Sequence, residues 1–337
     1  MFEKVNAGHP DKMADRLAGA VVDLVYERAG GLTKANPRVA CEVMAGHGRV
    51  DVQIETSLGR LDLRADDVDP LIHRLFGERV EGNVLIAPQD PHLSDNQTRG
   101  LRCGDNGIFK GCPPTEEQRV LTSLAATLYE NFPYDGKYVA GGMTLNPGSE
   151  YQAEVYGVTI CQSHATEEEI DECMRQWEEA NFGDMKNYPF EASCINPLGP
   201  WTGGIDVDCG CTNRKLGSDM GDGVTGGGLM GKDLSKADVS VNIVCFLKAV
   251  ASGQVVTAIC SIGDENVTFV YHAPSAALGD AQASLAPHSL ARGFTYPDGY
   301  TETERFADIV EQARLYILTL GGFEKFSMWG LIRPKTE

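Results

Sequence analysis

The chain has 337 residues, of which 42% are hydrophobic and 23% are charged, and its formal net charge is −19. This composition is that of a globular protein of two or three domains. A strongly negative surface repels nucleic acids and anionic membranes, so we expect neither as a partner. No apolar run approaches the ~20 residues of a membrane span, and the N-terminal residues lack the apolar core of a signal peptide. We therefore expect a cytoplasmic protein.

Ten cysteines in a chain of this length do not indicate a disulfide scaffold. Four of them lie in apolar segments, where free thiols pack as small core residues: Cys41, Cys161, Cys245 and Cys260. We therefore expect free thiols in a reducing compartment. Zinc is the alternative for the Cys209/Cys211 and Cys103/Cys112 pairs, although neither spacing matches a common zinc motif.

The first motif in the chain is GHPDK at residues 8–12. Its proline suits the first turn of a helix, and apolar residues then recur at helical spacing until two glycines at 30–31. His9, Asp11 and Lys12 are thus expected at a helix N-terminus, where backbone N–H groups favour phosphate and metal chemistry. The alternative is a capped surface helix in which Asp11 only complements the helix dipole.

Two strand-like runs follow at 39–43 and 50–56, joined by a turn with glycines at 46 and 48. Glu42 lies inside the first run. A buried glutamate needs a cation or a hydrogen-bond donor, whereas an edge strand with solvated acids would leave it in water. Next come a helix within residues 60–80 and a short strand at 83–86. A polar loop at 87–97 could gate a site, and residues 103–109 indicate a tight turn.

The second half of the chain alternates helices with hairpins. The patterns predict helices at 116–131, 166–177, 239–251 and 306–317, and strands at 137–145, 151–161, 255–262 and 267–271. Thr166 with Glu169, and Thr301 with Glu304, have the spacing of capping boxes that begin helices. This order predicts a layered α+β protein rather than a doubly wound parallel sheet.

Residues 221–238 read GDGVTGGGLMGKDLSKAD, with six glycines, two lysines and carboxylates at both ends. Such a segment brings bare backbone N–H groups and two ammonium groups close to an anion, most naturally a polyphosphate. Residues 226–232 spell G-x-x-x-x-G-K. However, Asp233 stands where a P-loop needs Ser or Thr, and the preceding residues 218–222 are too polar for a buried strand. The sequence therefore argues against a P-loop.

Six motifs occur together in one order: GHPDK at 8–12, ACE at 40–42, IETS at 54–57, GDNG at 104–107, DCGCTNRK at 208–215 and GGGLMGKDLSKAD at 226–238. This set resembles the S-adenosylmethionine synthetase (methionine adenosyltransferase) family over roughly residues 3 to 250. The resemblance implies an α+β fold of three similar α/β subdomains around a pseudo-threefold axis. We expect the subdomains at 1–95, 96–205 and 206–337, with some exchange of segments.

The resemblance also implies the reaction. The sulfur of methionine would attack C5′ of the ribose of ATP and expel the whole tripolyphosphate, which is then hydrolysed to phosphate and pyrophosphate. It implies Mg²⁺, two ions per site, and K⁺. The family assembles as a homodimer, or a dimer of such dimers, with active sites at the interface and half of each site from each chain.

Residue roles follow from the motifs. The resemblance assigns catalysis to His9, Lys137, Arg214, Lys232 and Lys236. It assigns ATP binding to His9, Lys12, Asp105, Asp135, Lys137, Arg214, Lys215 and Lys232. It assigns methionine binding to Glu55, Gln89, Asp208 and Lys236. Asp11 and Asp238 would bind magnesium and Glu42 potassium, and Glu3 also matches an acidic position near the site.

The chain departs from the family pattern at several points. It is shorter than usual, has Asn6-Ala7 where serine-glutamate is common, and has a shortened loop at 87–103. The glycine loop is one residue short and has Thr225 where histidine is common. We therefore hypothesise lower activity or a changed substrate preference. The alternatives are a member acting on another thioether or nucleotide, a tripolyphosphatase, and a non-catalytic regulatory homologue.

Overall fold

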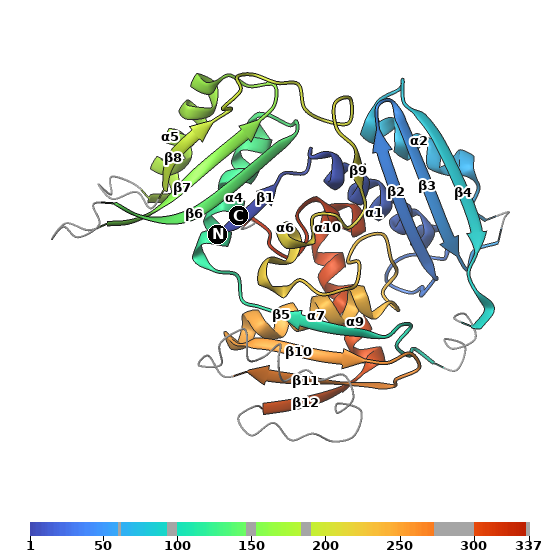
Figure 1. Cartoon of the computed structure of the whole chain (residues 1–337). Helices are drawn as coiled ribbons and strands as arrows, with labels where there is room; N and C mark the ends of the chain where they lie inside the picture. Colours follow the sequence, from blue (N-terminus) through green and yellow to red (C-terminus); the bar gives the residue numbers. More distant parts are fainter. Residues whose placement is uncertain (60–61, 93–99, 146–152, 183–189, 273–299, 335–337) are drawn as a thin grey trace.

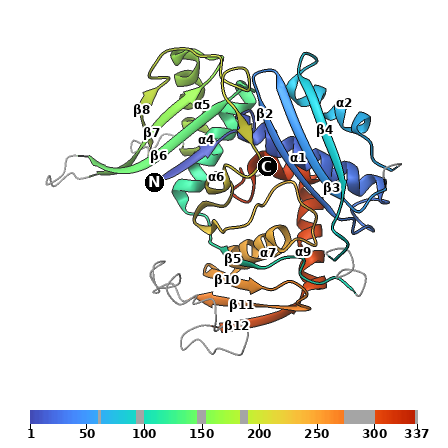
Figure 2. The ribbon, with the colours of Figure 1, turned by 45° about the vertical axis from the view of Figure 1, so that its right-hand side comes forward.

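The computed structural model describes residues 1–59, 62–92, 100–145, 153–182, 190–272 and 300–334. Three four-stranded sheets surround a central group of helices (Figure 1). Helices α1 and α2 pack on the first sheet, α4 and α5 on the second, and α7 and α9 on the third (Figure 2). The predicted α+β class, with three similar units around a pseudo-threefold axis, is confirmed.

The first sheet, here the β2 sheet, has the order β4 (Glu81–Pro88), β3 (Arg49–Thr56), β2 (Val39–Gly46) and β9 (Gly210–Cys211). The hairpin of β2 and β3 turns at His47 and Gly48, both with positive φ. Strand β4 runs parallel to β3, and α2 (Ala65–Phe76) provides the crossover between them. Helix α1 (Pro10–Arg28) packs on the inner face of this sheet.

The second sheet, the β6 sheet, has the order β1 (Phe2–Val5), β6 (Gly136–Leu145), β7 (Ala153–Gln162) and β8 (Phe190–Ile195). Its helices are α4 (Glu116–Asn131) and α5 (Glu167–Phe182). The capping box predicted for the second of these helices is confirmed, because Thr166 and Glu169 exchange side chain–backbone hydrogen bonds of 2.8 and 3.2 Å.

The third sheet, the β10 sheet, has the order β12 (Tyr300–Arg305), β11 (Asn266–His272), β10 (Val255–Cys260) and β5 (Gly107–Gly111). Helices α7 (Ala237–Ser252) and α9 (Phe306–Leu320) cover its inner face. Each sheet thus includes one strand, β9, β1 or β5, that is distant in sequence from most of its partners. The unit boundaries near residues 95 and 205 stay a prediction.

The predicted capping box at Thr301 and Glu304 is wrong. Both residues lie in β12, where Thr301 pairs with Val270 and Glu304 with Val267, and α9 begins only at Phe306. The spacing of three arises here from a strand in which threonine and glutamate alternate. Its glutamates, Glu302 and Glu304, form ion pairs with Lys248 of α7.

A fully buried lysine, Lys4, lies at the centre of the molecule. Lys4 Nζ donates to the carbonyl oxygens of Ser218, Trp329 and Ile332 at 2.8, 3.0 and 2.6 Å. These bonds join β1 to α6 (Leu216–Met220), to the end of α10 (Phe323–Trp329) and to the chain that follows it. Because an ammonium group has three donors, this cage satisfies all of them.

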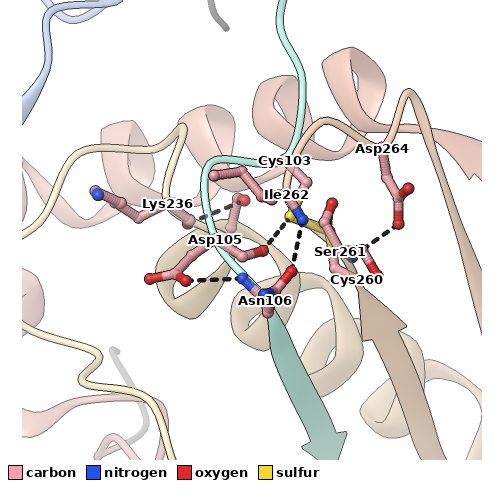
Figure 3. The surroundings of a disulfide bond; sticks show 9 residues. Cys103, Asp105, Asn106, Lys236, Cys260, Ser261, Ile262 and Asp264 are labelled. Atoms are coloured by element: carbon pink, nitrogen blue, oxygen red, sulfur yellow. Dashed lines mark hydrogen bonds between the residues drawn. A yellow bond between two sulfur atoms is a disulfide. The ribbon is translucent and has the colours of Figure 1, made fainter. Parts of the chain in front are cut away.

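The expectation of free thiols is wrong for Cys260, which forms a disulfide with Cys103. The bond connects the turn before β5 to the end of the neighbouring β10 (Figure 3). The two cysteines are 157 residues apart, so their local sequence gives no sign of the pairing. Cys103 is therefore not available for zinc together with Cys112. Cys41, Cys161 and Cys245 are free thiols, as expected.

No helix in the described part of the chain combines the length and the apolar character needed to cross a membrane.

Candidate active site

The GHPDK motif forms the beginning of α1. His9 is the N-cap residue with an extended backbone, and its Nδ1 accepts from the backbone N of Asp11 at 3.2 Å. Gly8 allows a close approach to the neighbouring unit, since a Cβ there would lie 2.6 Å from the backbone of Tyr134. The motif thus forms the start of α1 and packs directly against the segment that leads into β6.

The His9 side chain is almost completely buried. Burial, and then the positive charge of Lys215, lower the pKa of His9 to about 3, so the ring is neutral near pH 7. Because Nδ1 accepts the amide hydrogen of Asp11, the proton of the neutral ring lies on Nε2. His9 is therefore a hydrogen-bond donor without charge.

Asp11 connects α1 to the segment after β9. Its Oδ1 accepts from the backbone N of Cys211 at 2.8 Å and lies 3.5 Å from Arg214 Nη1, while its Oδ2 lies 3.7 Å from Lys215 Nζ. Glu3 of β1 continues the chain of charges, with carboxylate oxygens 3.6 Å from Lys215 Nζ and 3.1 Å from Lys137 Nζ. Residues from the β6 sheet, from α1 and from the segment after β9 therefore contribute to one charged group.

Asp135 lies beside this group, buried just before β6. Its Oδ2 accepts from the backbone N of Gly204 at 2.9 Å, whereas its Oδ1 has no hydrogen-bond partner among the described residues. Burial, followed by the nearby carboxylates of Asp208 and Asp11, raises the pKa of Asp135 to about 6. An unpaired buried oxygen of this kind suits a ligand donor or a cation.

We call this set the α1 cluster: Glu3, His9, Asp11, Asp135, Lys137, Asp208, Arg214 and Lys215. Asp208 is exposed, and it is close enough to influence the pKa of both His9 and Asp135.

Trp201, which was not predicted as a site residue, lies beside the site. A Cβ at Gly203 would lie 2.8 Å from Trp201 Cζ3 and 2.9 Å from Asp135 Cβ, so the indole ring borders the α1 cluster. The run of glycine and proline at 199–204 indicated only a chain break. An aromatic residue inside such a break was the available signal.

A second group lies at the glycine-rich segment. Lys232 Nζ is 2.8 Å from Asp238 Oδ2, and Lys236 is the N-cap residue of α7, in whose first turn Asp238 lies. The backbone N of Gly104 donates to Ser235 O at 3.3 Å, which brings the turn containing Asp105 beside Lys236 (Figure 3). We call Asp105, Lys232, Lys236 and Asp238 the glycine-loop cluster.

The two clusters lie at opposite ends of β2. Lys232 forms a β-bridge with Ala40, whereas β9 pairs with Met44 and Ala45. The start of α1 packs against β9, because a Cβ at Gly210 would lie 2.0 Å from Pro10 O. Ala40 and Ala45 are separated by roughly 16 Å along an extended strand. No hydrogen bond or ion pair joins the two clusters within the described residues.

Three predicted residues lie on or near the outer face of the β2 sheet. Glu55 is exposed on β3, and half-buried Gln89 follows β4, with its backbone N donating to Thr56 O at 3.0 Å. Glu42 is exposed on β2 and accepts from the hydroxyl of Thr212. The burial expected for Glu42 is wrong. Its side chain is solvated, as the alternative expected, although β2 is an inner strand with one face in solvent rather than an edge strand.

Lys12 belongs to neither cluster. Its ammonium group is fully buried, 3.0 Å from Asp15 Oδ2 and 2.7 Å from Asp219 Oδ1. It follows Asp11 directly in a helix, so its side chain points toward the core when Asp11 faces the site.

The carboxylates of the two clusters fit magnesium. Mg²⁺ is usually bound by one or two carboxylates together with substrate phosphates, and not by an all-protein cage. The described residues contain no group of three metal-ligating side chains. Asp11 lies beside the positive charges of Arg214 and Lys215, and Asp135 has an unpaired buried oxygen, so either carboxylate could hold such an ion.

The fold matches that of a solved S-adenosylmethionine synthetase. An unusual S-adenosylmethionine synthetase from Campylobacter jejuni superposes with a TM-score of 0.59 over 80% of each chain, at 21% identity. The S-adenosylmethionine synthase of Cereibacter sphaeroides is 28% identical over 272 residues, covering 71% of this chain and 69% of its own. The corresponding protein of Mesoplasma florum is 26% identical over 288 residues, covering 74% of each.

No protein-family model matches the sequence. The relatives and the solved structure nevertheless confirm the resemblance that the six motifs indicated. The chain is thus similar to S-adenosylmethionine synthases, at 26–28% identity to these two relatives.

Proposed function

We propose that the protein forms S-adenosylmethionine from ATP and L-methionine, with hydrolysis of the tripolyphosphate to phosphate and pyrophosphate. The observation that supports this most directly is the α1 cluster. There the neutral N–H donor of His9 stands beside Lys215, Arg214 and Lys137, at the N-terminus of a helix. The similarity to proteins named S-adenosylmethionine synthase supports ATP and methionine as the substrates of this arrangement.

The chemistry suits these residues. The sulfur lone pair forms a bond to C5′ while the C5′–O bond breaks and the tripolyphosphate leaves with the electron pair. The sulfur carries no proton before or after the attack, so no general base is needed there. Catalysis depends on alignment and on stabilising negative charge at the leaving oxygens. In this proposal Nε2–H of His9 donates to the leaving oxygen, and the lysines and Arg214 hold the phosphates.

Metal ions complete the proposed site. Asp11 and Asp238 are the proposed magnesium ligands, and Glu42, beside the Thr212 hydroxyl, is the proposed potassium ligand. Bound Mg²⁺ would neutralise part of the polyphosphate charge. Lys12, which we expected to contact ATP, is better assigned to holding the start of α1 through Asp15 and Asp219.

We further propose a homodimer in which the α1 cluster of one chain faces the glycine-loop cluster of its partner. The separation of the clusters along β2 supports this arrangement, because one chain alone does not bring them together. The proposed contact surface is the outer face of the β2 sheet, where Met44 and Leu85 are 58% and 59% exposed. Glu55 and Gln89, the proposed methionine-side residues, lie at one end of this sheet.

The test is incubation of the purified protein with ATP, methionine, MgCl₂ and KCl. We expect S-adenosylmethionine, phosphate and pyrophosphate in equal amounts, detected by mass spectrometry and phosphate assays. Lys232→Ala and Asp238→Asn should abolish the product, whereas Lys34→Ala, at an exposed lysine outside both clusters, should not.

Two other outcomes would contradict the proposal. Phosphate release without any sulfonium product, independent of methionine, would indicate a tripolyphosphatase. Formation of ADP would indicate phosphoryl transfer from ATP instead of adenosyl transfer.

A further inference from the structure

Asn213 lies between the basic pair Arg214–Lys215 and the glycine-rich segment that contains Lys232. It directly precedes Arg214 and Lys215, and its φ of 63° lies in the left-handed region that asparagine tolerates better than most residues. Its backbone N donates to Asp15 Oδ1 at 2.8 Å. Asp15 is itself buried and paired with Lys12, so Asn213 is tied firmly to α1.

The side chain of Asn213 binds the glycine-rich segment. Its Nδ2 donates to Met230 O at 3.2 Å, and its Oδ1 accepts from Met230 N at 2.8 Å. One amide group thus satisfies both backbone polar groups of Met230. Gly228 permits this contact, because a Cβ there would lie 2.8 Å from Asn213 Nδ2.

Met230 lies two residues before Lys232, and the intervening chain is also held from the other side. The backbone N of Cys41 donates to Gly231 O at 2.7 Å, and the backbone N of Asp233 donates to Val39 O at 3.0 Å. The backbone that carries the Lys232 side chain is therefore fixed between β2 and Asn213.

We infer that Asn213 is a positioning residue. It holds the Lys232 end of the glycine-rich segment in a fixed position on α1 and β2, without touching the substrate itself. Such preorganisation matters because a small displacement of a binding group weakens its interaction with a rigid anion. This inference rests on the proposed function, because that function provides the polyphosphate that Lys232 would bind.

The test is Asn213→Gly in the full-length protein. The substitution keeps the left-handed backbone conformation accessible and removes the side chain with its amide group. With inorganic tripolyphosphate and MgCl₂ in isothermal titration calorimetry, we expect Kd to rise about tenfold, and KM for ATP to rise in parallel. His47→Gly is the matched control, because His47 also has positive φ (51°) and is exposed at a turn. It should change neither value.

A second variant guards against a folding defect at residue 213. In Gly228→Ala the added methyl group displaces the Asn213 amide from Met230. This variant should weaken tripolyphosphate binding to a similar degree. Gly217→Ala, at an exposed glycine outside the glycine-rich segment where an added Cβ meets no atom within 4 Å, is its control.

A double-mutant cycle separates positioning from a merely structural role. In a Lys232→Ala background, Asn213→Gly should change Kd by less than about twofold, because the group that it positions is gone. An equal loss in both backgrounds would overturn the inference, as would an unchanged Kd for Asn213→Gly. If the wild type makes S-adenosylmethionine and Asn213→Gly equals it throughout, only the inference fails. If the wild type neither binds tripolyphosphate nor forms product, the proposed function fails and the inference with it.

Discussion

The backbone of Gly227 lies directly against the carboxylate of Asp238, and a Cβ added at residue 227 would lie 2.0 Å from Asp238 Oδ1. Asp238 Oδ2 is at the same time 2.8 Å from Lys232 Nζ. The glycine-rich segment thus folds over the proposed magnesium ligand. Any side chain at residue 227 has to displace either the loop or the carboxylate.

We therefore predict that Gly227→Ala lowers the rate of S-adenosylmethionine formation by about tenfold or more, because the loop can no longer close on Asp238. The measurement is the initial rate over a series of Mg²⁺ concentrations. Gly226→Ala is the control, since residue 226 is exposed and its added Cβ would meet no atom within 4 Å. Equal losses in the two variants would show that the contact with Asp238 is not the cause.

The proposed dimer predicts complementation between inactive chains. Lys215→Ala damages the α1 cluster and Lys232→Ala damages the glycine-loop cluster, so each homodimer should be inactive. A mixed dimer has one site in which both clusters are intact. The purified mixed dimer should then show about half of wild-type activity, because one of its two sites is intact.

Co-expression of differently tagged chains, followed by an assay of the doubly purified dimer, measures this recovery. The matched control is Lys215→Ala with Lys137→Ala. Both residues belong to the α1 cluster, so no site in the mixed dimer is intact. Recovery in neither pair would mean that each site is built within one chain.

Asp135 should make stability depend on pH. Its pKa is raised from 3.8 to about 6 in the folded protein, mainly by burial. The folded state therefore holds the proton more tightly than the unfolded state between these values. The resulting stabilisation is present below pH 4 and is lost as pH rises through 6, by at most about 3 kcal/mol.

The measurement is urea denaturation of the ligand-free wild type and Asp135→Asn from pH 4.5 to 7.5. The free energy of unfolding of the wild type should fall relative to the variant as pH rises. A constant difference across this range would show that Asp135 titrates normally.

The disulfide between Cys103 and Cys260 predicts eight free thiols among ten cysteines in the unfolded, non-reduced protein. Thiol titration in denaturant measures this number, and ten thiols would contradict the bond. Cys103→Ser should lower the free energy of unfolding by about 2–5 kcal/mol under oxidising conditions, because a long loop is no longer closed. Cys209→Ser, at an exposed free thiol, should change it by less than about 0.5 kcal/mol.

Local patterns predicted the longer elements well. The helix expected at 116–131 is α4, and the helix expected from the GHPDK motif is α1. Periodicity and capping act between residues three or four positions apart, so one stretch of sequence contains the whole signal. The same reasoning failed at Thr301 and Glu304, because a strand of alternating polar residues also places threonine and glutamate three apart.

Short elements with distant partners were not predicted. Strand β1 has four residues and pairs with β6, where Phe2 lies opposite Ala140. Strand β5 begins inside what we expected to be only a turn, and it pairs with β10 almost 150 positions later in the chain. Such strands are stabilised by their partners, and their own few residues have no recognisable period.

The sequence by itself determined the family resemblance, the α+β class and the identity of the charged residues, because these depend on residue types in a fixed order. Only the tertiary structure decided where those charges go. It buried Lys12 between two carboxylates, left Glu42 in solvent, joined Cys103 to Cys260 and separated Lys232 from Lys215 along β2. Each of these outcomes depends on contacts between segments far apart in the chain, and no local propensity contains that information.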